Sequence, residues 1–199
     1  MFEIRLHDEI YQAEPFTLNE YEDLIAEWSD EKVLRLLKKV KGYNINNPKH
    51  YTECVFAQLW AISLGDMNQQ KTISCECGAE HDLFINYGYI NTPIEKGFIY
   101  SVGEYKIKFR YPIIFEDKDQ IEMVARCMQS IMYKDEEVLI SDLDQASLDA
   151  LYGLLTAEHI ELLIKELLSP AISIGLPVEC GNVYHIKGLS EMLRVIEHG

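Results

Sequence analysis

Two short cysteine-bearing segments contain the residues of this chain that are best suited to chemistry. The first is "SCECGAEHDLFIN" (residues 74–86), in which Cys75 and Cys77 are separated by one residue and followed by a glycine. The second is "PVECGNVYHIKGL" (residues 177–189), which repeats the order Glu-Cys-Gly around Cys180. In both segments a β-type run leads into the cysteine turn and another leaves it. Because thiolates on glycine-containing turns suit tetrahedral zinc, the pair predicts a zinc-ribbon-like site.

The predicted ligand set needs a histidine. The first turn supplies two cysteines, but in the second Val178 stands where a partner for Cys180 would be expected. The fourth ligand is therefore His185 or His81, giving a set of three cysteines and one histidine. Three interpretations stay open from the residues alone: a structural zinc site, a metal-free pair of β-turns, and a catalytic thiol pair. A thiol pair would need a lowered pKa, as at a helix N-terminus, whereas the sequence after Cys77 indicates a turn and a strand.

The rest of the chain contains no recognisable catalytic motif. It has no glycine-rich phosphate loop, no nucleophile elbow and no H-E-x-x-H sequence. Cys54 and Cys127 lie in apolar helical runs, where we expect them to be small buried hydrophobic residues. The sequence therefore predicts no enzyme and no catalytic residues.

Composition excludes several classes of function. The 199 residues include 48% hydrophobic residues, enough for a core, and the formal net charge is -15. Such a charge repels a phosphate backbone, so we expect no nucleic-acid partner. No signal peptide or membrane-spanning segment is evident. Five cysteines without a secretory signal indicate reduced thiols in a cytosol.

Periodicity predicts an α+β fold with a small antiparallel sheet that carries the cysteine turns and packs against two groups of helices. Residues 1–66 predict a β-hairpin, a helix capped by Thr17 with Glu20, a helix over 31–40, and an apolar central helix ending at Gly65. Residues 67–115 predict short strands with the first cysteine turn.

The last part, residues 116–199, predicts mostly helices. A helical run is expected over Asp117 to Tyr133, followed by two helices that Ser141 or Asp142 and Thr156 would cap. Two strands around the second cysteine turn and a final helix complete the chain. No flexible linker is evident, so we predict one domain over residues 1–199.

The order of these parts resembles a known family. It is carried by "PFTLNEYEDLI" (15–25), "ISCECGAEHDLFIN" (73–86), "YKIKFRYPIIFEDKDQIEMV" (105–124), "DLDQASLDALYGLL" (142–155) and "VECGNVYHIKGLSEML" (178–193). In these segments the chain resembles the baseplate hub subunits and hub assembly proteins of T4-like contractile-tailed phages. The resemblance implies a non-enzymatic protein that assembles or forms part of the central hub of the tail baseplate. It implies other hub and spike proteins as partners, and a place in the host cytoplasm during assembly or in the virion tail.

Two other hypotheses remain. One is a zinc-ribbon adaptor in transcription or translation, which would need a basic groove that the charge disfavours. The other is an enzyme that uses the C-x-C pair for thiol exchange. For the hub hypothesis, partner contacts could come from exposed aromatic residues, with ordinary strand packing as the alternative; the candidates are Tyr87, Tyr89, Phe98 and Tyr100.

Overall fold

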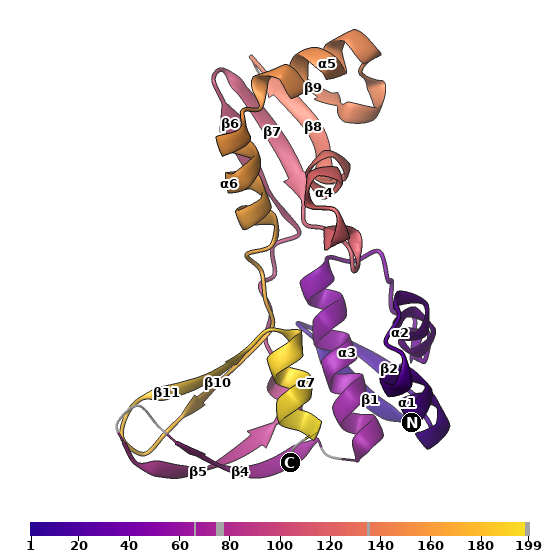
Figure 1. The fold of residues 1–199 in the computed structure, drawn as a ribbon, viewed down its shortest axis with the longest axis vertical. Helices are drawn as coiled ribbons and strands as arrows, with labels where there is room; N and C mark the ends of the chain where they lie inside the picture. The colour runs from indigo at the N-terminus through magenta and orange to yellow at the C-terminus, as the bar shows by residue number, and fades with distance from the viewer. Residues whose placement is uncertain (66, 75–77, 135, 198–199) are drawn as a thin grey trace. The chain divides into compact units, whose positions relative to one another are not determined.

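The computed structural model describes residues 1–65, 67–74, 78–134 and 136–197 (Figure 1). In these residues the chain forms seven α-helices and eleven strands, and the strands make four separate antiparallel sheets. The predicted α+β class is confirmed, but the strands do not join into one small sheet. The chain divides into two compact units: unit 1 contains residues 1–93 and 171–199, and unit 2 contains residues 94–170.

Unit 1 begins with the predicted hairpin, strands β1 (Phe2–Leu6) and β2 (Glu9–Ala13), to which the short strand β3 (Val40–Lys41) is added. Helix α1 (Leu18–Ala26) starts with the expected capping box of Thr17 and Glu20. Helix α2 (Asp30–Leu37) ends earlier than the predicted range of 31–40, because Val40 pairs with Ala13 as part of the sheet.

Helix α3 (Lys49–Leu64) is the centre of unit 1, as its apolar sequence on all sides predicts. It contacts β1 and the C-terminal helix α7 (Leu189–Glu197). The fully buried Trp60 lies among four aromatic rings whose centroids are 5.2–5.9 Å from its own. These rings belong to Phe16, Tyr21, Trp28 and Phe56. One indole of α3 therefore contacts α1, the segment before α1 and the segment between α1 and α2.

Two further hairpins complete unit 1. Strands β4 (Asn68–Ser74) and β5 (Glu80–Asn86) form one, and β10 (Ser173–Pro177) and β11 (Val183–Lys187) form the other. The backbones of Asn91 and Ser173 exchange two hydrogen bonds of 2.8 Å, which closes unit 1 at the point where the chain leaves it and returns. A 3₁₀ turn, η1 (Tyr87–Tyr89), follows β5.

Unit 2 is a four-stranded sheet with helices on one face. Its strands are in sequence order, β6 (Gly97–Val102), β7 (Tyr105–Arg110), β8 (Met128–Tyr133) and β9 (Glu136–Leu139). Its helices are α4 (Gln120–Cys127), α5 (Gln145–Leu154) and α6 (Ala157–Leu167), with 3₁₀ turns η2 (Glu116–Lys118) and η3 (Ile140–Asp142). Val102, Ile107 and Phe109 of the sheet form one buried cluster with side chains of all three helices.

Two predictions for this part of the chain are wrong. The expected helix over Asp117 to Tyr133 ends at Cys127, and the residues after it form β8, which pairs with β7 and β9. Pairing with β7 on one side and β9 on the other overrides the helical spacing of Met128, Ile131 and Met132. Helix α5 is capped by Asp144, whose carboxylate accepts a 2.8 Å hydrogen bond from the Ser147 amide, and not by Ser141 or Asp142. The Thr156 cap of α6 is confirmed.

The prediction of one domain stays a prediction. The two compact units are divided at residues 93/94 and 170/171, so they cut across the regions 1–66, 67–115 and 116–199 that the sequence indicated. Across the described residues, no helix combines the length and the apolar character that a membrane crossing requires.

Candidate functional site

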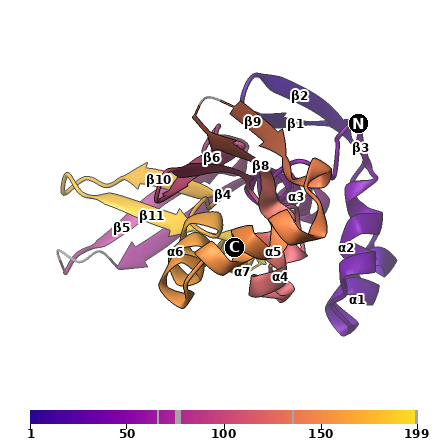
Figure 2. The same cartoon turned by 90° about the horizontal axis from the view of Figure 1, so that it is seen from above.

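The two cysteine turns lie on the hairpins β4–β5 and β10–β11, both in unit 1. Figures 1 and 2 show these hairpins running out in the same direction from α7. The turn of the second hairpin is closed by hydrogen bonds from the Gly181 amide to the Val178 carbonyl (2.9 Å) and from the Val178 amide to the Asn182 carbonyl (3.0 Å). Gly181 has a φ of 87°, a left-handed conformation that favours glycine directly after the cysteine.

The structure places only some of the predicted metal ligands. Cys75 and Cys77 lie outside the described residues. Cys180 is exposed on its turn, and His185 is exposed on β11, opposite Gly175. His81 is half-buried on β5, opposite Ile73. Within residues 1–65, 67–74, 78–134 and 136–197, no three or more His, Cys, Asp or Glu side chains gather to hold a metal ion.

A polar contact that the sequence did not reveal joins β4 to the end of α7. The Gln69 side chain donates a 2.8 Å hydrogen bond to the Ile196 carbonyl and accepts one of 2.6 Å from the Tyr87 hydroxyl. The Lys71 ammonium donates to the Val195 carbonyl. The last carbonyls of a helix have no intrahelical partner and carry partial negative charge, so an amide and a cation are suitable donors there.

A second such contact joins β1 to α3. The Gln58 side chain accepts a 3.0 Å hydrogen bond from the Arg5 amide and donates one of 2.6 Å to the Arg5 carbonyl. It therefore acts as a strand partner at the edge of β1. The only sequence signal for Gln58 and Gln69 is a polar side chain at a position that the pattern assigns to the interior.

The cysteines of the helices behave as expected for core residues. Cys54 on α3 and Cys127 on α4 are both buried, which confirms the prediction for them. Burial raises the pKa of each thiol to about 12, although Gln58 lowers the pKa of Cys54 and Arg110 lowers that of Cys127. Both therefore remain protonated at neutral pH and are poor nucleophiles.

A two-point ion pair in unit 2 joins the end of β7 to η2. The Arg110 guanidinium donates to both oxygens of Glu116, at 2.7 and 2.8 Å, and Glu116 also accepts from the Ile113 amide at 2.8 Å. Burial alone would raise the pKa of Glu116, but the hydrogen bonds from Arg110 and Ile113 outweigh it and lower that pKa. Two hydrogen bonds in parallel fix the segment between β7 and α4, which gives this pair a structural role.

The four candidate aromatic anchors separate into two kinds. Tyr87 is fully buried, and Phe98 and Tyr100 pack against the core cluster of unit 2, as the packing hypothesis predicts. Tyr89 is different, because 76% of its surface is exposed. It lines a 350 Å³ hollow of unit 1 together with residues that include His7 and Thr92.

These features define an α+β protein in which buried polar side chains connect strands and helices that are far apart in the chain. The chain belongs to a family of tail proteins: the family model described as "T4 bacteriophage base plate protein" matches residues 1–194. It is also 31% identical over 205 residues to the baseplate hub assembly protein gp26 of Enterobacteria phage T4, and the match covers 98% of each chain. No solved structure matches the chain. The family resemblance inferred from the sequence is thereby confirmed.

Proposed function

We propose that this protein assembles, or forms part of, the central hub of a phage tail baseplate through contacts with other hub and spike proteins. The observation that carries this proposal is the 31% identity with the hub assembly protein gp26, which extends over 98% of both chains. A match from end to end includes both compact units, so the role of the relative is proposed for the whole chain and not for one segment of it.

The chemistry of the chain suits a role in assembly. A formal net charge of -15 keeps a protein soluble and directs its association toward particular partners. The buried thiols of Cys54 and Cys127 are protonated, and the Arg110–Glu116 pair fixes a segment of backbone. We therefore propose a non-enzymatic function, exercised in the host cytoplasm while the tail is being built.

The experiment is deletion of the gene from the phage and complementation with the intact chain. We expect the deletion to stop baseplate assembly at the hub, which electron microscopy of infected-cell extracts would detect, and the intact chain to restore it. Normal baseplates from the deletion phage would overturn the proposal. Mass spectrometry of purified virions then separates a hub subunit, which is present in the particle, from an assembly factor, which is not.

We also propose that the two cysteine turns bind a structural zinc ion. The ligands would be Cys75, Cys77 and Cys180, with His185 or His81 as the fourth. Support comes from the exposure of Cys180 and from the shared direction of the two hairpins (Figure 2). Bound there, zinc would link the hairpins by coordinate bonds, which contribute directly to folding free energy.

The zinc proposal has a direct measurement. Elemental analysis of the purified protein should find about one zinc per chain, and Cys180→Ser should lose it. Cys54→Ala is the matched control, since that thiol is buried on α3, and it should keep the metal. Comparison of His185→Ala with His81→Ala identifies the fourth ligand. A folded, metal-free wild-type protein would contradict the zinc proposal and leave the hub proposal unaffected.

A further inference from the structure

Within the described part of unit 2, the helices cover only one face of the sheet, and no helix of this unit packs on the other face. Helices α4, α5 and α6 pack on the face that carries Val102, Ile107 and Phe109. The strand register therefore assigns the opposite face a different set of side chains. We call this the basic sheet face and define it by five residues: Ile99, Lys106, Lys108, Met132 and Leu139.

The basic sheet face combines exposed apolar surface with positive charge. Ile99 is 55% exposed and Leu139 is 52% exposed, and both lysines are exposed. Lys106 and Lys108 are two residues apart on β7, so they project from the same face about 7 Å apart. These two neighbouring lysines form a small positively charged region on a chain whose formal net charge is -15.

These lysines have no acidic partner among the described residues. Opposite Lys106 lie Ser101 and Met132, and opposite Lys108 lie Ile99 and Ser130. The register also places Glu137 on this face, opposite Met132, and its carboxylate accepts a hydrogen bond from the Ser130 hydroxyl.

The arginines of unit 2 differ from these lysines. Arg110 pairs with Glu116 at 2.7 Å and Arg126 pairs with Glu122 at 2.6 Å. Thus the unit neutralises its arginines internally and leaves the two lysines of this face available for a counter-charge from outside.

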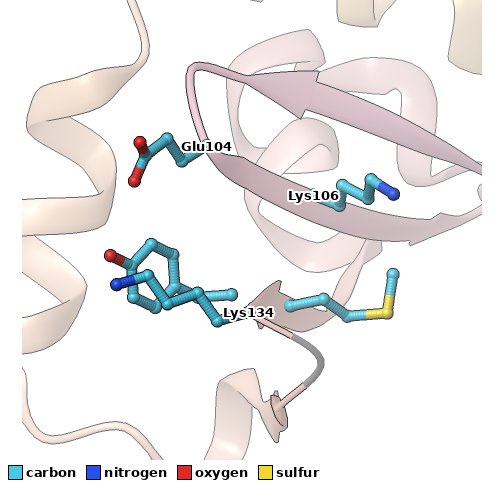
Figure 3. A pocket seen from close by; sticks show the side chains of 5 residues that line it. Glu104, Lys106 and Lys134 are labelled. Carbon is cyan, nitrogen blue, oxygen red and sulfur yellow. The ribbon is translucent and has the colours of Figure 1, made fainter.

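A pocket of about 390 Å³ continues the face toward the turn between β6 and β7 (Figure 3). It is lined by Glu104, Lys106, Met132, Tyr133 and Lys134. Figure 3 shows the ammonium group of Lys106 on the side away from Glu104, so that this carboxylate does not neutralise it. The Lys134 ammonium lies 4.9 Å from the centre of the Tyr133 ring. The pocket lining thus combines a thioether and an aromatic ring with two cations.

We propose that the basic sheet face binds an acidic, extended segment of another tail protein. Carboxylates on alternate residues of that segment would pair with Lys106 and Lys108, since side chains on one face of a strand recur at the same spacing as these lysines. An apolar side chain of the segment would enter the pocket beside Met132 and Tyr133. A second copy of the chain suits the face less well, because two chains of charge -15 repel each other. The inference rests on the proposed hub function and names the chemistry of the partner.

The test uses the full chain carrying the photo-crosslinker benzoylphenylalanine in place of Ile99, expressed in cells infected with the deletion phage. We expect crosslinks to another tail protein, mapped by mass spectrometry to a peptide rich in Asp and Glu. The matched control carries the crosslinker in place of Leu162, which is 48% exposed on α6 and outside the face. Crosslinks only to a second copy, a neutral or basic peptide, or a yield no greater than that of the control would overturn the proposal.

Charge variants supply the second measurement. Lys106→Gln with Lys108→Gln should reduce the crosslink at position 99 about fivefold to tenfold, because each exposed ion pair contributes modestly. Lys38→Gln with Lys165→Gln removes the same number of exposed charges elsewhere and should have no effect. Thermal unfolding of both pairs should match the wild type. The intact chain could rescue the deletion phage while Lys106→Gln with Lys108→Gln leaves the crosslink yield unchanged. That result would overturn the proposed binding site on the basic sheet face and leave the hub function supported.

Discussion

The two compact units of this protein are stabilised in different ways. Unit 1 is assembled from two stretches of chain, and its interior includes polar side chains that bind backbone groups far away in sequence. Gln58 binds the backbone of Arg5, and Gln69 binds that of Ile196. Unit 2 is one continuous stretch, and its interior is an apolar cluster between a sheet and three helices. Unit 1 therefore adds individual buried hydrogen-bonded pairs to its apolar core around α3, whereas unit 2 depends mainly on apolar burial.

The difference has a physical basis in loop closure. The two stretches of unit 1 are separated in the chain by the 77 residues of unit 2, 94–170. The C-terminal stretch can pack against the N-terminal one only when this long loop is closed. Bringing distant segments together costs conformational entropy, and specific buried hydrogen bonds help to select one arrangement. In unit 2 successive strands are neighbours in the sheet, so its contacts form between segments that are close in sequence.

The largest expected effect comes from truncating one buried aromatic side chain in each unit. Trp60→Ala in unit 1 and Phe109→Ala in unit 2 should each reduce the free energy of unfolding by about 4 kcal/mol, because both side chains are fully buried. Hydrogen exchange measured on individual peptides shows which elements each variant destabilises. We expect Trp60→Ala to raise exchange in α1, α2 and α3, and Phe109→Ala to raise it in β6 to β9.

This pair of variants also tests the prediction of one domain. If residues 1–199 unfold as one cooperative domain, each variant will raise exchange across the whole chain and calorimetry will record one transition. Two transitions, each moved by only one of the variants, would contradict that prediction and support independent stability of the two units.

Two adjacent glutamines of β4 test the role of buried polar pairs in unit 1. Gln69→Ala should cost about 2 kcal/mol, because the Ile196 carbonyl and the Tyr87 hydroxyl both lose a buried partner. Gln70→Ala is the control, since Gln70 is exposed on the opposite face of the same strand, and it should change stability little. Urea unfolding of both variants measures the difference. Equal effects would show that the Gln69 contact does not stabilise unit 1.

The ion pair of unit 2 predicts a dependence on pH. The pKa of Glu116 in the folded state lies below its ordinary value of 4.5, so its stabilising contribution is complete above that pH and is lost as the pH falls through the folded pKa. Glu116→Gln should therefore cost about 1.5 kcal/mol at pH 7 and progressively less below about pH 4.5.

Denaturant unfolding between pH 7 and pH 3 measures this difference from the wild type. The control is Glu122→Gln, which breaks the exposed pair with Arg126, in which both side chains are 55% exposed. It should cost no more than about 0.5 kcal/mol at any pH. A cost of Glu116→Gln that does not change with pH would contradict the assigned pKa direction.

The smallest expected effect compares the two capping boxes, one in each unit. Thr17→Ala removes the cap of α1, and Thr156→Ala removes the cap of α6. Each should cost about 1 kcal/mol, because an amide of the first turn loses its side-chain acceptor. Thr→Ser at either position keeps the hydroxyl and should restore most of the stability. Thermal unfolding provides the measurement, and losses well above 2 kcal/mol would indicate a role beyond capping.

Local features of the fold were predictable from the sequence because their causes are local. The capping boxes of α1 and α6 each depend on residues three positions apart, and the apolar sequence of α3 alone shows that it must be covered on several sides. The helix predicted over Asp117 to Tyr133 was wrong for a non-local reason. Met128, Ile131 and Met132 have helical spacing, but pairing of residues 128–133 with β7 and β9 makes this segment a strand.

Among the candidate sites, too, the sequence revealed the features with local causes and missed those that depend on distant contacts. The sequence identified both cysteine turns and the buried character of Cys54 and Cys127, since flanking residues determine these properties. It did not identify Gln58, Gln69 or Lys71 as contacts, because a polar residue in a strand or helix does not indicate which distant carbonyl it meets. The sequence did not identify the basic sheet face either, because only the strand register shows that neutral residues lie opposite Lys106 and Lys108.

By itself the sequence determined the fold class, most helices and hairpins, the acidic charge and the resemblance to baseplate hub proteins. These properties follow from composition and from spacings of a few residues, which the chain carries whether folded or not. Tertiary structure decided the division into two units, the identity of β8 and the pairing of Gln69 with the end of α7. Each of these depends on contacts between residues far apart in the chain, whose free energy exists only once the backbone has brought them together.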